Sequence, residues 1–235
     1  MTNLRRFIFS LPVYLFVFGG CIILTVFSDR AITAMHETMP LAGRKCIVID
    51  AGHGGEDGGA VSCTGIFEST INLEIASRLK DLLDFLGYQT KMIRTEDVSL
   101  HTQGNSIAAH KVSDLKNRVK FVNAVESAIL VSIHQNFFPE QKYAGPQVFY
   151  TSTYSGKDLA TSMQRQLVCV LSPESKRTCK TASGIYLMDH IQCEGILIEC
   201  GFLSNPEEEA KLRSSDYQKL LCSVISSVLA NYVST

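Results

Sequence analysis

The chain has 235 residues, of which 46% are hydrophobic and 19% are charged, and its formal net charge is -1 at pH 7. These values describe a globular protein with one domain of ordinary size and exclude a largely disordered chain. They also exclude a strongly basic overall composition, so nucleic acid is not expected as a partner.

The first predicted element is an apolar helix. Residues 7–27 carry no charged side chain, and a helix of that length spans a hydrocarbon core of about 30 Å. Arg5 and Arg6 precede it, so the positive-inside rule puts everything after it outside the cytoplasm. We therefore expect residues 1–28 to be a signal anchor or a signal peptide, and the protein to be extracytoplasmic, membrane-anchored or exported. A retained anchor is preferred, and cleavage stays open because the flanking cleavage sites are weak.

Residues 29–44 mix small, polar and proline residues and are expected to form a linker. A folded domain, residues 45–235, follows it. The predicted strands are 46–50, 88–94, 128–134, 146–150 (at an edge), 184–188 and 195–200, and the predicted helices are 69–86, 114–125 (capped by Ser113 or Asp114), 156–171 and 216–232. Residues 95–113 are expected to form a surface loop. This alternation predicts a single three-layer α/β domain, with a central mixed, mostly parallel sheet flanked by helices.

Seven cysteines follow the apolar N-terminal segment, and no two of them have the C-x-x-C spacing of a zinc ribbon. Cys169 and Cys179 are candidates for a disulfide. The disulfide state of the seven stays open.

Four residues carry the chemistry of the predicted domain. Functional side chains of α/β sheets collect at the carboxyl ends of strands, and His53, His134 and Glu199 lie at such ends. Glu68, just before the first predicted helix of the domain, completes the set. Two imidazoles and one carboxylate suit a catalytic zinc ion with a position left for water. The fourth group is then available as a base.

Each residue alone also has a simpler interpretation. A histidine after a strand usually makes hydrogen bonds within a loop and binds no metal. Glu68 would suit the N-terminus of a helix, where the helix dipole favours a carboxylate. Glu199 is different because it ends the apolar run Gly-Ile-Leu-Ile, where an unpaired carboxylate costs on the order of several kcal/mol.

The glycine-rich segment 52–59 invites comparison with a phosphate-binding loop. It contains neither G-x-G-x-x-G nor a Gly-Lys-Ser/Thr, and Glu56 and Asp57 would repel phosphate. A close approach of backbone to a metal-bound substrate is the preferred interpretation.

Six blocks run in order from Lys45 to the C-terminus: IVIDAGHGGEDGGA, the segment from Glu68 to Asn72, RTEDVSL, RVKFVN, LVSIHQN and ILIECGFLSNPEE. In these blocks the chain resembles the zinc-dependent N-acetylmuramoyl-L-alanine amidases of the type-3 class. The resemblance implies that residues 45–235 are a catalytic amidase domain. Its expected reaction is cleavage of the amide between the lactyl group of N-acetylmuramic acid and L-alanine of the stem peptide.

The family's functional positions can be carried over by residue. The resemblance implies that His53, Glu68 and His134 bind one Zn²⁺ and that Glu199 is the catalytic residue. Asn136 matches the family's asparagine after the second histidine. A role facing the substrate, or supporting the ligands, is expected for it.

Within the family, the anchored architecture and the polar insert 100–112 resemble the germination-specific amidases of spore-forming bacteria. This implies spore-cortex peptidoglycan as substrate, the route to muramic-δ-lactam, and the space between the forespore and mother-cell membranes. A vegetative cell-wall amidase acting in cell separation or lysis is the alternative. An accessory activator protein is expected as a partner because no wall-binding module follows the domain.

Two other kinds of protein stay open as alternatives. One is a zinc peptidase or sugar deacetylase, although the H-E-x-x-H pattern of the commonest zinc peptidases is absent. The other is a non-catalytic, membrane-tethered protein with a wall-binding or regulatory role. Retention of all four chemical positions argues against the second.

Overall fold

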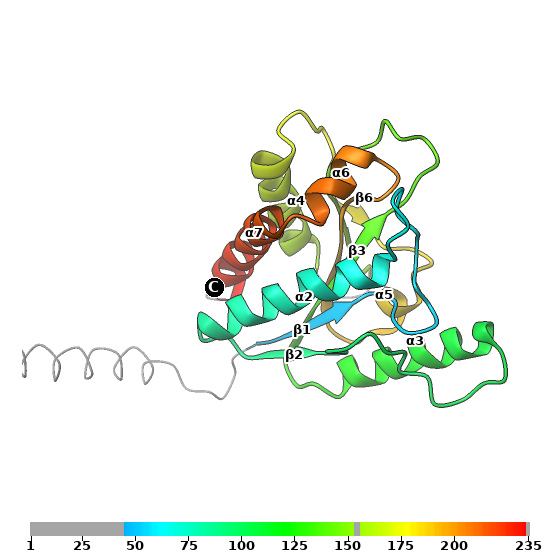
Figure 1. Ribbon diagram of the computed structural model, residues 1–235. Coiled ribbons are helices and arrows are strands. Elements are labelled where there is room, and N and C mark those ends of the chain that lie inside the picture. Colours follow the sequence, from blue (N-terminus) through cyan, green and yellow to red (C-terminus); the bar gives the residue numbers. More distant parts are fainter. Residues whose placement is uncertain (1–44, 153–155, 234–235) are drawn as a thin grey trace, which may run out of the picture. The chain divides into compact units, whose positions relative to one another are not determined.

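The computed structural model describes residues 45–152 and 156–233 (Figure 1). The predicted membrane segment 1–28 and the linker 29–44 lie outside the described residues, and both stay predictions. None of the helices that the structure describes is long and apolar enough to cross a membrane.

Six strands form one sheet in the order β2-β1-β3-β6-β4-β5. They are β1 (Cys46–Ala51), β2 (Thr90–Met92), β3 (Ala128–Asn136), β4 (Gln147–Tyr150), β5 (Lys180–Thr181) and β6 (Glu194–Phe202). Neighbouring strands are parallel except for β4 and β6, which are antiparallel. The predicted α/β fold with a mixed, mostly parallel sheet is therefore confirmed for the described residues.

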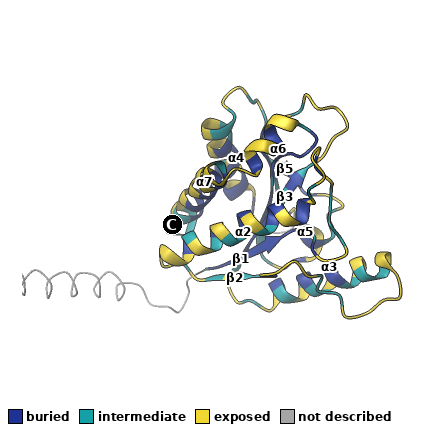
Figure 2. Ribbon diagram, in the orientation of Figure 1, coloured by how far each residue is buried: buried dark blue, intermediate teal, exposed yellow. Residues whose placement is uncertain are grey.

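Helices cover both faces of the sheet (Figures 1 and 2). The helices are α2 (Glu68–Phe85), α3 (Ile107–Asn123), α4 (Lys157–Leu171), α5 (Tyr186–His190), α6 (Pro206–Leu212) and α7 (Ser215–Val233). Alternate residues of a strand point to opposite faces. Ile47 and Ile49 of β1 therefore join one apolar core with α2, α4 and α7, while Val48 joins a second core with α3 and α5. Burial on both faces explains why β1 reads as a continuously apolar run.

The start of α3 differs from the prediction. The helix begins at Ile107, and the Ser106 side chain caps it by accepting a hydrogen bond from the Ala109 N–H at 3.2 Å. The predicted start at Ser113 or Asp114 was wrong, and so was the extension of the loop to Ser113. Ser106 satisfies one of the unpaired N–H groups of the first turn, and this frees Asp114 for a tertiary role inside the helix.

Two further elements correct the sequence prediction. The segment 184–188, predicted as a strand, contains the start of α5, and Leu187 and Met188 of this helix are buried in the second core. Short apolar runs fit a strand or a buried helix equally well, and only the packing partner distinguishes them. The predicted edge strand, β4, pairs on both sides, so β5 forms the edge. Helix α6 and strand β5 were not predicted.

All seven described cysteines are free thiols, so the candidate pair Cys169 and Cys179 is not joined in this structure. Three of the seven, at positions 46, 200 and 222, are buried as small apolar side chains.

Candidate metal centre

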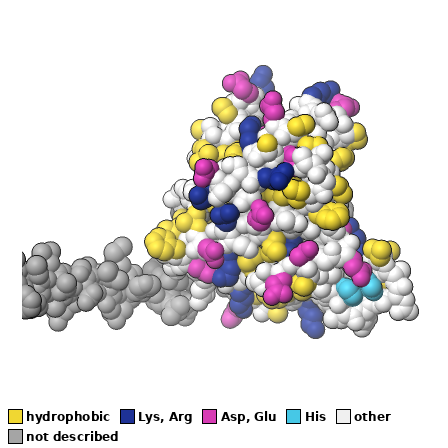
Figure 3. Space-filling model, in the orientation of Figure 1, with side chains coloured by type: hydrophobic (Ala, Val, Ile, Leu, Met, Phe, Trp, Pro, Cys, Tyr) yellow, Lys and Arg dark blue, Asp and Glu magenta, His cyan; other side chains and the backbone are white. Residues whose placement is uncertain are grey.

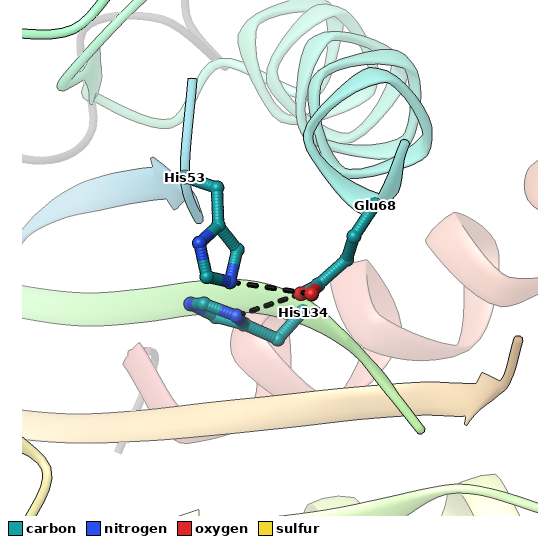
Figure 4. A group of neighbouring side chains, drawn as sticks. All are labelled: His53, Glu68 and His134. Atoms are coloured by element: carbon teal, nitrogen blue, oxygen red, sulfur yellow. Dashed lines mark hydrogen bonds and ion pairs between the residues drawn. The ribbon is translucent and has the colours of Figure 1, made fainter. Parts of the chain in front are cut away.

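The structure brings three of the predicted residues into one cluster (Figure 4). His53 follows β1, His134 lies in β3, and Glu68 is the first residue of α2, so its carboxylate comes from a helix and not from a strand end. Glu68 Oε2 lies 3.2 Å from His53 Nε2, and Glu68 Oε1 lies 3.0 Å from His134 Nδ1. One ligand atom from each of the three residues lies within 4.8 Å of the others. This spacing suits a single divalent metal ion.

Asp57 orients the ring of His53. Asp57 Oδ2 lies 3.0 Å from His53 Nδ1, which leaves Nε2 to face Glu68. A carboxylate on the far nitrogen is the usual support of a metal-binding histidine. Burial lowers the pKa of His53, but hydrogen bonds to Asp57 and Glu68 outweigh it and raise that pKa to about 9. This role of Asp57 was not predicted, although its position four residues after His53 is visible in the sequence.

The Glu68 carboxylate is held by three further donors. Its Oε1 accepts from Asn72 Nδ2 at 3.1 Å and from the Gln135 N–H at 3.1 Å, and its Oε2 accepts from the Ala60 N–H at 3.0 Å. Gln135 Nε2 in turn donates to Asn72 Oδ1 at 3.1 Å. Burial raises the pKa of Glu68, but hydrogen bonds from His134 and His53 outweigh it and hold that pKa well below its usual range. The oriented, ionised carboxylate is the form that binds metal.

Glu199 lies in β6, directly opposite His134 in the parallel pairing of β3 and β6. Its Oε2 atom is buried and has no hydrogen-bond partner among the described residues. Burial is the main cause that raises the pKa of Glu199 to about 7, and the negative charge of Glu68 adds to it. A carboxyl with a pKa near neutrality beside a metal-type cluster is suited to accept and return a proton.

Two glycines allow the backbone to approach these side chains. A Cβ atom at position 52 would lie 2.2 Å from the His134 ring, and one at position 59 would lie 2.6 Å from Glu68 Oε2. His53 itself has φ 61, a left-handed conformation that is uncommon for a residue other than glycine. The predicted close approach of this loop is therefore an approach to the cluster's own side chains.

We expect Gly52→Ala to be far more damaging than Gly58→Ala. At position 52 the new methyl group meets the His134 ring, which Glu68 holds, whereas at position 58 it meets the half-exposed Phe67 ring, which can turn outward. The expected loss of unfolding free energy is about 1–3 kcal/mol for Gly52→Ala and smaller for Gly58→Ala. Urea unfolding of both variants checks this, and equal losses would contradict it.

Two buried arginines hold the backbone of the loop after β1. Arg118 Nη2 donates to the His53 carbonyl at 2.6 Å, and Arg118 Nη1 donates to the Ala51 carbonyl at 3.0 Å. Arg94 Nη2 donates to the Gly52 carbonyl at 3.0 Å. Both arginines lie in blocks that carry the family resemblance, but sequence reasoning assigned them no role. The available signal in the sequence was Asp114, which lies four residues before Arg118 and so could form an ion pair with it on a helix.

Asn136 lies at the end of β3. Its main-chain carbonyl accepts from the Leu203 N–H at 2.8 Å, and no hydrogen bond of its side chain is found within the described part of the chain. The side chain is thus available, as the predicted substrate-facing role requires, and that role stays a prediction.

A cavity of about 240 Å³ opens beside the cluster. His53, His134 and Glu199 line it, together with Lys111 and Leu115 of α3 and Leu187 of α5. The cluster therefore faces the side of the sheet covered by α3 and α5. The site offers two imidazoles and the Glu68 carboxylate as metal ligands. It also holds the Glu199 carboxyl, whose Oε2 has no hydrogen-bond partner among the described residues. Together these groups define a hydrolase-type site suited to a divalent metal.

Comparison with known proteins agrees with this class. The family model for N-acetylmuramoyl-L-alanine amidases, Amidase_3, matches residues 47–231. A germination-specific N-acetylmuramoyl-L-alanine amidase of Bacillus subtilis (strain 168) is 39% identical over 197 residues, which are 83% of this chain and 82% of that relative. The chain belongs to this amidase family, whose members hydrolyse an amide bond of peptidoglycan.

Solved structures of the family have the same fold. The CwlD amidase from Clostridioides difficile, in complex with the GerS lipoprotein, has a TM-score of 0.77 at 34% identity, covering 81% of this chain and 98% of that one. An N-acetylmuramoyl-L-alanine amidase from Clostridium difficile 630 has a TM-score of 0.71 at 28% identity, covering 83% of this chain and 99% of that one. The predicted membership of the family is thus confirmed.

Proposed function

We propose that this amidase depends on one Zn²⁺, held by His53, Glu68 and His134, and that Glu199 is the catalytic residue. The donor set fits zinc because it offers two imidazoles and an ionised carboxylate and leaves a position free for water. The placement of Asp57 on the far nitrogen of His53 supports the same assignment. When bound, the metal supplies Lewis acidity toward the amide carbonyl and lowers the pKa of a water to about 7.

The observation that carries the catalytic proposal is the buried Oε2 of Glu199, which has no hydrogen-bond partner among the described residues. In the proposed reaction this carboxylate takes a proton from the attacking water. It then passes the proton to the nitrogen of the leaving L-alanine. The bond that breaks joins the lactyl carbonyl of N-acetylmuramic acid to that nitrogen. Asn136, at the end of the same strand as His134, is proposed to face the substrate.

Removal of the metal tests the zinc proposal. We expect a chelator to abolish release of stem peptides from peptidoglycan and stoichiometric Zn²⁺ to restore it, because no described side chain replaces the Lewis acid. Mass spectrometry of the digest checks metal and bond together. Release of acetate, or of peptide fragments cut within the stem, would instead indicate a sugar deacetylase or a zinc peptidase.

We propose spore-cortex peptidoglycan as the substrate, on the route to muramic-δ-lactam. The similarity to a germination-specific amidase supports this, as does the insert 100–112, which lies partly in α3 beside the catalytic cavity. Digestion of purified cortex and vegetative peptidoglycan under the same conditions tests it. Faster release from vegetative wall would favour the alternative role in cell separation or lysis.

We also propose that the domain acts outside the cytoplasm, held by the apolar segment 7–27, in the space between the forespore and mother-cell membranes. A related amidase has been solved with a lipoprotein, which supports the proposal of an accessory activator for this chain. Full zinc occupancy and full activity of the isolated protein on intact peptidoglycan would remove the need for such a partner.

A further inference from the structure

Three exposed phenylalanines lie beside the metal centre. Phe67, Phe137 and Phe138 are 53%, 48% and 44% exposed, and we call them the aromatic rim. Phe67 directly precedes Glu68. Phe137 follows His134 by three residues, so their Cα atoms are at most about 11 Å apart. Hydrophobic side chains are scattered over the face that Figure 3 shows, so exposure alone does not identify a binding surface. The position beside the proposed ligands distinguishes the rim.

Main-chain hydrogen bonds join both parts of the rim to the turn between β6 and α6. The Leu203 N–H donates to the Asn136 carbonyl at 2.8 Å, and the Leu203 carbonyl accepts from the Cys63 N–H at 3.2 Å. Asn136 adjoins the two phenylalanines that follow β3. Cys63 lies in a tight loop that the pairing of Val61 with Phe67 closes. Leu203 therefore lies between the two parts of the rim, which are neighbours in the fold.

The loop that follows β3 is held in place by contacts with the same turn. The Phe138 N–H donates to Ser204 Oγ at 3.2 Å, and the Phe138 ring meets the Tyr143 ring edge to face, with centroids 4.9 Å apart. Asn205 Nδ2 donates to the Tyr143 carbonyl at 3.2 Å. A surface whose conformation is fixed before binding loses less entropy when a ligand binds. The exposed rings therefore belong to a fixed loop, as a binding surface requires.

The chemistry of the rim fits the sugar rings of peptidoglycan better than its stem peptide. Phenyl rings carry no charge and no hydrogen-bond donor, and their electron-rich faces attract the C–H faces of a pyranose ring. The cavity of the metal centre differs, because Asp57, Lys111 and Glu199 line it and give it charges of both signs. The charged groups of a stem peptide suit that cavity. The scissile amide joins the sugar side of the substrate to its peptide side, so an apolar border and a charged border can each take one of them.

We propose that the aromatic rim binds the glycan strand, with sugar rings stacked on Phe137 and Phe138, while the scissile amide lies at the metal centre. The proposal rests on the amidase function proposed above and names the part of the substrate that the rim takes. Asn136 lies between the rim and His134, and its side-chain amide would form hydrogen bonds with a hydroxyl or acetamido group of the sugar. A glycan strand would then bind more tightly than a peptide that carries the lactyl group alone.

The test uses the full chain with Zn²⁺ and compares Phe137→Ala/Phe138→Ala with the control Phe85→Ala/Leu86→Ala. Both pairs remove two exposed apolar side chains, but Phe85 ends α2 about 26 Å from Glu68 along the helix. The substrates are glycan strands that carry stem peptides and a lactoyl-peptide without sugar, and the binding probe is the same glycan strands without peptides.

We expect the rim variant to raise KM for the glycan strands about tenfold, with kcat within about twofold, and to bind the peptide-free strands about tenfold more weakly. KM for the lactoyl-peptide should change by less than about twofold, because this substrate has no ring to stack on the rim. Phe137→Tyr/Phe138→Tyr keeps both aromatic rings and should restore most of the affinity.

The control variant should match the wild type in each measurement, and equal thermal midpoints show that the variants fold. Unchanged binding of peptide-free strands by the rim variant would overturn the proposal. An equal rise in KM for the lactoyl-peptide would overturn it as well, because the rim would then act on the peptide or on the metal centre. So would a dimer that light scattering finds for the wild type and not for the rim variant, since a second copy of the chain would then cover the rim. A wild-type enzyme that releases no stem peptide would refute the proposed function instead, and the titration with peptide-free strands would still decide whether the rim binds sugar.

Discussion

A Glu199→Gln variant is expected to lose about 100- to 10,000-fold in the rate of stem-peptide release while it keeps its metal. The amide has the shape of the carboxyl but cannot accept the proton of the attacking water. Because Glu199 lies next to the metal cluster and is not one of its three proposed ligands, zinc content should stay at one per chain. Single-turnover digestion of muropeptides, together with metal analysis, measures both quantities.

The same substitution carries a second expectation, for stability. The wild-type Oε2 atom is buried and has no hydrogen bond within the described residues, so a neutral amide removes an unfavourable burial. The thermal midpoint of Glu199→Gln should equal or exceed that of the wild type. Glu194→Gln is the matched control, since Glu194 begins the same strand but pairs with Lys45 at the surface. Wild-type turnover in Glu199→Gln with normal zinc would refute the assignment.

The largest expected loss of stability belongs to Arg118→Met. Arg118 is 2% exposed, and its guanidinium lies 2.6 Å from Asp50 and 2.6 Å from Asp114. Removing it leaves the fully buried Asp50 carboxylate without its counter-charge, which costs about 3–5 kcal/mol of unfolding free energy. The loop carrying His53 also loses two of its donors, so zinc affinity should fall. Urea unfolding measures the first effect and chelator competition the second.

The loss in Arg118→Met should depend on pH. Burial raises the pKa of Asp50, but the charge of Arg118 outweighs it and lowers that pKa below its usual value in the wild type. The pairing therefore contributes its full stability above about pH 4 and loses it as pH falls further. In the variant, burial without the cation raises the pKa of Asp50, so its carboxyl becomes neutral at a higher pH. The gap in stability between the two proteins should narrow as the solution is acidified, and a constant gap would contradict this explanation.

Lys120→Met provides the control for this prediction, because Lys120 is an exposed cation on the same helix. Loss of a solvated surface charge should change stability by about 0.5 kcal/mol or less. A similar loss in both variants would point to the helix as a whole and not to the buried ion pair.

The comparison of sequence with structure separates local signals from long-range ones. Strands β1 and β3 were predictable because each is a short apolar run buried on both faces, and α2 because its apolar residues recur at helical spacing. The segment 184–188 was not, since five apolar and small residues fit a strand or a helix until the second core selects one. The start of α3 was misplaced because Ser106 lay within a polar stretch that looked like loop.

The sequence by itself predicted which residues form the proposed site. His53 follows an apolar strand, and His134 and Glu199 lie near the carboxyl ends of two others. Parallel strands bring their carboxyl ends to one edge, so the meeting of these residues was predictable. Only the tertiary structure decided how their side chains are held. The orientation of Glu68 by the Gln135 N–H and the support of the His53 loop by the buried Arg118 depend on contacts between residues far apart in the chain. The burial of the Glu199 oxygen that has no hydrogen-bond partner among the described residues also depends on the packed fold. Such contacts leave no spacing pattern, because the packed fold and not the local backbone sets their geometry.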